Sequence, residues 1–271
     1  MSIAFVWYWN RATEILNSWR DGLRAAIEQI EKNHHVAWYL DEQIPLEGYY
    51  DAILFWGDSE CPFFNELHRY PKSKKGLCLS TMPTNFENLR MLDVVFCESQ
   101  PVYEAVRAQG IHAVKAFGTD TAFFIPGPDT EVKDIEYFYP ATLSPWKKQS
   151  SIAHYGDKLL CVGTVQPDGE GELKACKDNG VRVEIGYFPA EKIRDYYRRA
   201  KRCIIPAIHG SERTCLEAMA MNILPEVNPE NVKTYSYIEE FQKSGHLFPR
   251  DFVVANYSHV VYAKQILKGL S

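Results

Sequence analysis

The chain has 271 residues, 46% of them hydrophobic, and a net charge of −5 at pH 7. This length suits two compact α/β domains, and the apolar fraction is enough for a packed core. No apolar run reaches the roughly 18 residues of a membrane span, and the first residues form no basic leader, so we expect no transmembrane segment and no signal peptide. The negative charge argues against broad nucleic-acid affinity but leaves a local basic surface possible.

The seven cysteines and eight histidines show no spacing typical of metal ligands. No CxxC pair occurs, and Cys78, Cys97, Cys161 and Cys203 lie in apolar, strand-like runs. We therefore expect reduced core cysteines, no structural zinc, and a cytoplasmic location in a bacterium or, for a viral protein, in its host.

Apolar runs alternate with amphipathic stretches over the first part of the chain. Strands are predicted at residues 2–9, 35–40, 50–57, 74–80, 92–99 and 111–117. Helices are predicted at residues 18–33, 62–70 and 101–110. In the first helix Leu23, Ala26, Ile27 and Ile30 share one face. Such alternation indicates a mostly parallel, doubly wound sheet.

A segment rich in Gly, Pro, Asp and Thr, residues 118–136, reads as a linker, and the alternation then restarts. Strands are predicted at residues 135–141, 157–165, 181–188 and 203–207, and helices at 172–180, 190–202, 213–221 and 258–270. The sequence thus predicts an α/β protein with two Rossmann-like, doubly wound domains facing a cleft. We expect one domain at 1–125, a second at 126–255, and a C-terminal helix at 256–271 that packs back toward the first.

The stretch "HGSERTCLEAMAMNILPEV" (209–227) places polar chemistry at the mouth of a helix that follows a strand. Ligands of open α/β sheets bind at this edge, and a helix N-terminus suits an anion. Gly210 and Ser211 allow close backbone approach, Arg213 offers a fork of donors to phosphate, and Thr214 adds a hydroxyl. Glu217 could accept hydrogen bonds from a ribose. The alternative is a capped helix with solvated charges.

This stretch resembles the donor-binding motif of retaining, nucleotide-sugar-dependent glycosyltransferases of the family 4 type, which have the glycosyltransferase-B fold. That motif has a Glu, seven residues, and a second Glu before Ala-Met-Ala; "HGSERTCLEAMA" matches it with Glu217 as the second Glu and His209 in place of the first. "YFYPATLSPWKKQ" (137–149) matches a segment in which Lys147 falls on the phosphate-binding Lys and Thr142 replaces an Arg. Two further matches are "NGVRVEIGYFPAEKIRDYYRRAKRCIIPA" (179–207), which contains the family's Gly-Tyr-Val-Pro-like segment, and "AFGTDTAFFIP" (116–126).

The resemblance implies transfer of a sugar from a nucleoside diphosphate sugar, with retention, and UDP is favoured by the habit of the family. The implied donor-binding residues are Glu217, Thr214, Gly210, Ser211, Thr142, Tyr187 and Leu216. Lys147 and Arg213 would stabilise the leaving diphosphate, Arg213 replacing the Arg lost at Thr142, and His209 would face the sugar. No Asp-x-Asp motif occurs, so no metal or other cofactor is expected.

The acceptor side is less specified. Asp58 follows a predicted strand and is the candidate base that an inverting reaction would need, with Glu60, Asn10 and Arg11 as acceptor contacts; all four could equally be polar loop residues. A saccharide or cell-surface glycan is the first candidate acceptor. Hydroxymethylated DNA, as used by compact bacteriophage enzymes of this fold, is the second, because the predicted helix "KIRDYYRRAKR" (192–202) could offer Arg194, Arg198 and Arg202 to phosphates. A third possibility is an inactive nucleotide-sugar-binding module. The sequence leaves the oligomeric state open.

Overall fold

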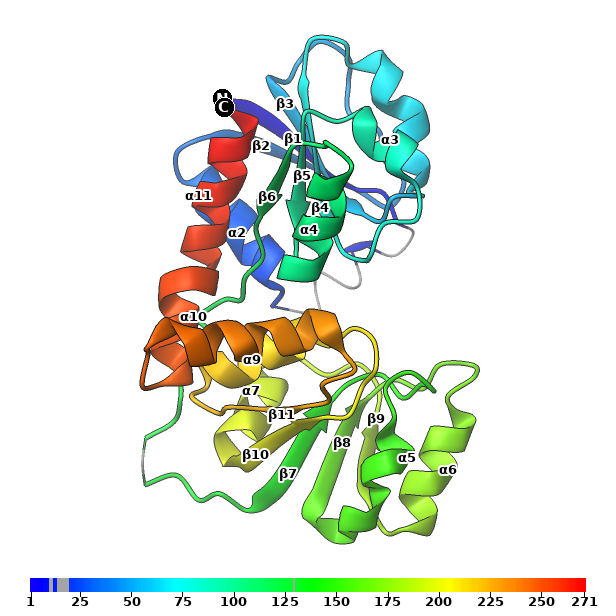
Figure 1. Ribbon diagram of the computed structural model, residues 1–271, viewed down its shortest axis with the longest axis vertical. Coiled ribbons are helices and arrows are strands. Elements are labelled where there is room, and N and C mark those ends of the chain that lie inside the picture. Colours follow the sequence, from blue (N-terminus) through cyan, green and yellow to red (C-terminus); the bar gives the residue numbers. More distant parts are fainter. Residues whose placement is uncertain (10–11, 14–19, 129) are drawn as a thin grey trace. The chain divides into compact units, whose positions relative to one another are not determined.

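The computed structural model describes residues 1–9, 12–13, 20–128 and 130–271 (Figure 1). It divides into two compact units: one is made of Met1–Gly118 and Tyr257–Ser271, the other of Thr119–Asn256. The chain therefore leaves the N-terminal unit once and returns to it for its last helix. Each unit is built around its own parallel sheet.

The sheet of the N-terminal unit has the strand order β2-β1-β3-β4-β5-β6, and neighbouring strands pair in parallel. The strands are β1 (Ser2–Trp7), β2 (His35–Leu40), β3 (Ala52–Gly57), β4 (Lys74–Leu79), β5 (Val94–Cys97) and β6 (Ala113–Lys115). The order reverses between β1 and β3, so their carboxyl ends form the switch point at which ligands bind in such sheets.

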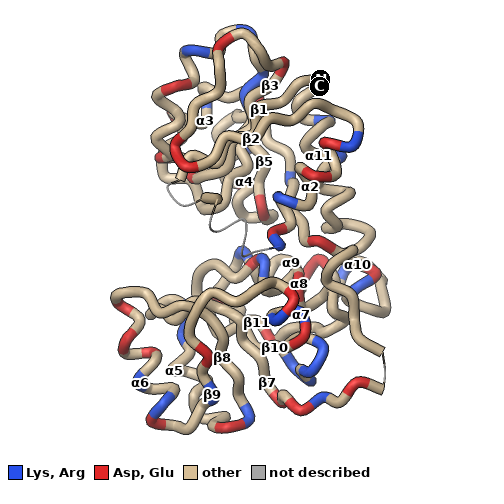
Figure 2. Tube along the Cα trace, turned by 180° about the vertical axis from the view of Figure 1, so that it is seen from behind, with Lys and Arg blue, Asp and Glu red and all other residues tan. Residues whose placement is uncertain are grey.

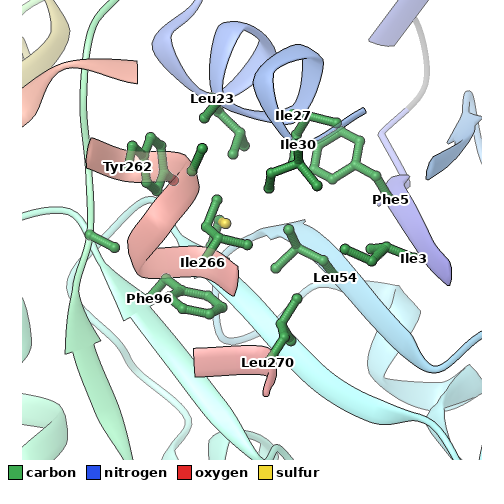
Figure 3. Packing of buried hydrophobic residues seen from close by; sticks show 14 of the residues in the cluster. Ile3, Phe5, Leu23, Ile27, Ile30, Leu54, Phe96, Tyr262, Ile266 and Leu270 are labelled. Carbon is green, nitrogen blue, oxygen red and sulfur yellow. The ribbon is translucent and has the colours of Figure 1, made fainter. Parts of the chain in front are cut away.

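Helices cover both faces of this sheet. On one face α2 (Gly22–Glu31) and α11 (His259–Leu270) lie side by side (Figure 1). Figure 3 shows Leu23, Ile27 and Ile30 of α2 and Ile266 of α11 in one apolar cluster over the strands, with Leu270 further along α11 near Leu54 and Phe96. The other face is covered by η1 (Pro62–Arg69), α3 (Phe86–Arg90) and α4 (Gln100–Ala108). Successive side chains of a strand point to opposite faces of the sheet, so the apolar strands present side chains to the helices on both faces.

The C-terminal unit has the strand order β11-β10-β7-β8-β9, again with parallel pairs. Its strands are β7 (Ile135–Pro140), β8 (Leu159–Gly163), β9 (Arg182–Ile185), β10 (Ala200–Ile205) and β11 (Glu226–Val227). Its helices are α5 (Gln149–Ile152), η2 (Ala153–Lys158), α6 (Glu170–Asp178), α7 (Ala190–Arg199), α8 (Glu212–Ala220), α9 (Val232–Ser244) and α10 (Pro249–Tyr257), which runs into the other unit. Here the switch point lies between β7 and β10. Two Rossmann-like parallel sheets are thus confirmed.

One predicted helix is too long. The helix expected at 190–202 ends at Arg199, because Ala200 already pairs with Ile135 as the first residue of β10. Arg202 therefore lies on a strand, and the shared helical face of Arg194, Arg198 and Arg202 does not exist. The segment predicted as helical at 62–70 is helical, and its helix is of the 3-10 type over Pro62–Arg69.

The seven cysteines are all buried and unpaired, as expected for core thiols. Burial raises the pKa of Cys61 to about 11 and that of Cys78 to about 12, so these thiols stay protonated and act as small apolar side chains. Over the ranges that the structure describes, none of the helices has the length and apolar character to cross a membrane.

Candidate functional site

Two loops meet at the switch point of the C-terminal unit. One follows β7 and leads through Thr142 to Lys147; the other follows β10 and leads through His209 into α8. They are joined where the backbone N–H of Ile208 donates to the carbonyl of Trp146 at 2.9 Å. The fold thus brings together residues that lie more than sixty positions apart in the sequence.

The second loop enters α8 through a tight left-handed turn. Gly210 has φ of 70° and Ser211 has φ of 78°, a conformation that a serine adopts only with outside support. Ser211 is the N-cap residue, and the helix begins at Glu212. A left-handed residue followed by a helical one directs successive backbone N–H groups into one concavity, which suits an anion.

The ammonium group of Lys147 lies directly over this turn. Its Nζ donates to Oγ of Ser211 at 2.9 Å and to the carbonyl of His209 at 3.3 Å. A Cβ atom on Gly210 would lie 2.7 Å from the same Nζ, so a larger residue there would displace the ammonium group, and the positive φ also favours glycine. The hydroxyl of Tyr139 approaches Oγ of Ser211 from below at 3.3 Å. A positive charge and the helix N-terminus therefore converge on one point.

Glu217 is buried one turn further along α8. Its Oε1 lies 3.3 Å from Nε of Arg213, and its Oε2 lies 3.3 Å from the hydroxyl of Tyr197. Burial, followed by the negative charge of Glu217, raises the pKa of Tyr197 well above its usual value, so its hydroxyl stays protonated, with the carbonyl of Thr214 at 3.2 Å as a second possible acceptor. Arg213 thus fixes the carboxylate as an i,i+4 partner, and its predicted contact with phosphate stays a prediction.

The remaining donor-side candidates take different positions. The hydroxyl of Thr214 donates to the carbonyl of Pro140 at 3.1 Å, which ties α8 to the end of β7. Thr142 shares a hydrogen bond of 3.1 Å with the hydroxyl of Thr164. Tyr187, after β9, is 54% exposed, and Leu216 is completely buried in the core. The side chain of Leu216 therefore packs in the core and is not accessible to a nucleotide sugar.

His209 is exposed beside these groups. Its pKa is lowered first by partial desolvation and then by the positive charges of Lys233 and Lys147, against the opposing effect of Glu212. The ring is therefore neutral near pH 7 and can accept or donate a hydrogen bond.

The candidate acceptor residues belong to the N-terminal unit. Asp58 follows β3 and accepts a hydrogen bond from the backbone of Glu60 at 2.8 Å, and Glu60 is exposed. Trp9 is 49% exposed, with its ring 6.0 Å from that of Trp56 at the same sheet edge. Asn10 and Arg11 lie outside the described residues.

Sequence reasoning missed the first turn of α9. Asn231 and Thr234 both donate to the carbonyl of Gly210, at 2.7 and 2.8 Å, and Lys233 pairs with Glu212 at 3.1 Å. A signal was present, because Asn is a favoured N-cap residue and Asn231 stands close behind the stretch 209–227.

Among the residues that the structure describes, we found no group of three or more His, Cys, Asp or Glu side chains that could hold a metal ion.

No family model matches the chain, and no curated protein does. Solved structures do match. HepE of Anabaena, solved with UDP and glucose, has a TM-score of 0.67 at 14% identity and covers 100% of this chain and 99% of its own. An α-glucosyltransferase solved with UDP and a 13-mer DNA has a TM-score of 0.58 at 9% identity, with coverages of 99% and 95%. UDP-N-acetylglucosamine 2-epimerase of Rickettsia bellii has a TM-score of 0.56 at 11% identity, with coverages of 100% and 96%.

These proteins match over nearly their whole length, so the likeness concerns both units and not one Rossmann-like half. Their reactions differ, and identities this low speak for architecture alone. Two parallel sheets, each with its switch point, and full-length matches of this kind identify the fold of the chain as glycosyltransferase-B.

Proposed function

We propose that the chain transfers a sugar from a nucleoside diphosphate sugar, with UDP as the favoured nucleotide, to an acceptor hydroxyl. One observation carries the proposal: Nζ of Lys147 lies 2.9 Å from Oγ of Ser211, over the N-terminus of α8 at the switch point. A cation and the positive end of a helix dipole aimed at one place stabilise the charge that develops on a leaving diphosphate. HepE and the α-glucosyltransferase, both solved with UDP, support the choice of nucleotide.

In this proposal the site residues have separate tasks. Lys147 and the turn at Gly210 and Ser211 hold the diphosphate, with Arg213 as a second cation. Glu217, already held by Arg213 and Tyr197, accepts from the ribose hydroxyls. Tyr187 lies beside the base and His209 beside the sugar, as the resemblance to family 4 implies. The same resemblance implies retention at the anomeric carbon, and the scheme needs no metal.

The charges of the chain favour a saccharide acceptor over DNA. The basic residues of α7 and β10 are paired with acids. The guanidinium of Arg199 donates to both carboxylate oxygens of Asp134, at 2.8 and 2.6 Å, and Nζ of Lys201 donates to Glu136 at 2.7 Å. Figure 2 shows acidic residues interspersed with the basic ones over this part of the chain. Neutralised cations release few counterions and therefore add little affinity for a phosphate backbone.

The distribution of charges in the N-terminal unit also favours a saccharide acceptor. Its basic segment 70–75 precedes and begins β4, at the amino edge of the sheet, whereas Asp58 and Glu60 follow β3 at the carboxyl edge. Carboxylates and an exposed aromatic ring, Trp9, follow neighbouring strands at this edge, and such groups suit a neutral, hydroxyl-rich ligand better than a polyanion. The buried, unpaired cysteines support a reducing, cytoplasmic setting for the reaction.

The test is nucleotide release from UDP-, GDP- and ADP-sugars, measured with oligosaccharide acceptors, with hydroxymethylcytosine duplex DNA, and with the same duplex carrying cytosine. We expect release that depends on a saccharide and falls at least tenfold in Lys147→Met. Release that depends on the modified duplex would instead favour the DNA-modifying alternative. Binding of nucleotide sugar without release from any donor would contradict transfer and favour the inactive module. The anomeric configuration of the product, read by NMR, tests retention.

A further inference from the structure

Two buried side chains at the start of α9 form hydrogen bonds to the left-handed turn at Gly210 and Ser211. Nδ2 of Asn231 and Oγ1 of Thr234 donate to the same carbonyl, that of Gly210, at 2.7 and 2.8 Å. Asn231 is 2% exposed and Thr234 is completely buried. Because buried donors hold their acceptors firmly, the direction of this carbonyl is fixed from outside the loop.

The direction of the Gly210 carbonyl also fixes the direction of a hydrogen-bond donor, the backbone N–H of Ser211. The peptide bond is planar and trans, so the N–H of Ser211 points opposite to the carbonyl of Gly210. With the carbonyl held by α9, this N–H is directed to the opposite side of the peptide, away from Asn231 and Thr234. The left-handed φ of Ser211, 78°, is one of the unfavourable conformations that persist only under such support.

These bonds are not needed for α9 itself. Oδ1 of Asn231 caps the helix by accepting from the backbone N–H of Thr234, which leaves its Nδ2 for Gly210. A buried ion pair joins the same two helix starts: Nζ of Lys233 lies 3.1 Å from Oε1 of Glu212, with side chains 4% and 7% exposed. The start of α9 is therefore built against the turn and not merely near it.

We propose that Asn231 and Thr234 are positioning residues of the diphosphate site, which hold the Gly210–Ser211 peptide so that the N–H of Ser211 donates to the bound anion. The inference rests on the proposed function in that the anion is taken to be the diphosphate of the donor. It adds that two side chains that do not touch the anion contribute to the affinity for it.

The experiment uses inorganic pyrophosphate and UDP as probes on the full-length protein. Binding is measured by calorimetry, and the amide signal of Ser211 is followed by 15N NMR. Thr234→Val keeps the shape of the side chain and removes the donor, whereas Thr234→Ser keeps the hydroxyl. Asn231→Ser keeps a residue that caps helices but is too short to reach Gly210. Thermal unfolding without ligand reports folding of each variant.

We expect pyrophosphate to shift the Ser211 amide in the wild type and in Thr234→Ser. Thr234→Val and Asn231→Ser should each bind pyrophosphate and UDP about three- to tenfold more weakly and show a reduced Ser211 shift. Thr234→Ser should stay within about twofold of the wild type.

A wild-type Ser211 amide that ignores pyrophosphate would overturn the inference, and so would folded variants that bind as tightly as the wild type. If the expected binding pattern appears but no nucleotide sugar is ever turned over, the positioning role stands and the proposed transferase activity fails. The two proposals are thus separable.

Discussion

At the scale of single residues, Lys147 carries the largest share of the proposed donor affinity. Its ammonium group already bonds Ser211 and the carbonyl of His209, so it is in place before a ligand arrives. Hydrogen bonds to charged groups contribute roughly 1.5–3 kcal/mol, or about 10- to 150-fold in affinity. We expect Lys147→Met to weaken UDP binding by that factor in calorimetry. Lys147→Arg, which keeps the charge, should lose less, and a Met variant that binds UDP normally would refute the role.

His209 gives a prediction about pH. Its pKa is lower in the folded chain than in the unfolded chain, mainly through desolvation and then through Lys233 and Lys147. As pH falls below about 6.5, the unfolded state takes up the proton first, so the folded state loses stability; above that pH the contribution is complete and constant.

The variant His209→Gln should remove this dependence. Its melting temperature, measured by scanning fluorimetry, should gain on the wild type between pH 7 and pH 5.5 and run parallel to it above pH 7. Because the ring is exposed, the expected gain is small. Parallel curves over the whole range would show that His209 titrates normally.

At the scale of elements, the path from β7 to Lys147 depends on close packing against the end of β8. A Cβ atom on Gly163 would lie 2.3 Å from the carbonyl oxygen of Ala141 and 3.0 Å from the backbone nitrogen of Thr142. Backbone atoms cannot move aside cheaply, so we expect Gly163→Ala to lower the free energy of unfolding by about 2–4 kcal/mol. It should also weaken UDP binding, because the displaced segment leads to Lys147.

Gly171, in α6, is the matched control. A Cβ atom there meets nothing within 4 Å, and alanine is the better helix former by about 1 kcal/mol. Urea unfolding should therefore show Gly171→Ala equal to or more stable than the wild type. If both glycine variants lost stability alike, the close approach at Ala141 would not be the cause.

The helices and strands also show which parts of the fold the sequence could predict. The strands were predictable because apolar runs alternate with stretches of helical periodicity. The glycosyltransferase-B fold was expected from a resemblance whose motifs lie in the C-terminal half and in the hinge segment that precedes it. The end of α7 was not predictable: Arg and Lys favour helices, and pairing of Ala200 with distant Ile135 decides where β10 begins.

In the site, spacing alone could have paired Arg213 with Glu217, since they are four residues apart on one helix. The bonds from Asn231 and Thr234 to Gly210 could not be predicted, because they depend on how the chain brings α9 back to the turn 21 to 24 residues later. Local patterns therefore supplied the candidates, and long-range packing decided their partners.

At the scale of the whole molecule, the last helix of the chain covers one face of the first sheet. Tyr262, Ile266 and Leu270 of α11 are at most 3% exposed and pack among residues of β1, α2 and β5 (Figure 3). The N-terminal unit is therefore closed only by the end of the chain, while the C-terminal unit holds the proposed donor site in one continuous segment. Stability of the first unit and binding by the second should respond to different changes.

Ile266→Ala tests this separation. Loss of a completely buried isoleucine should cost the N-terminal unit about 2–5 kcal/mol, whereas Lys264→Ala, on the exposed side of α11, should be nearly neutral. In calorimetric scans we expect Ile266→Ala to lower one transition and UDP to raise another, because a ligand stabilises only the unit that binds it. UDP affinity itself should be unchanged in the folded variant. A single transition moved by both changes would show that the two units unfold together and would contradict their independence.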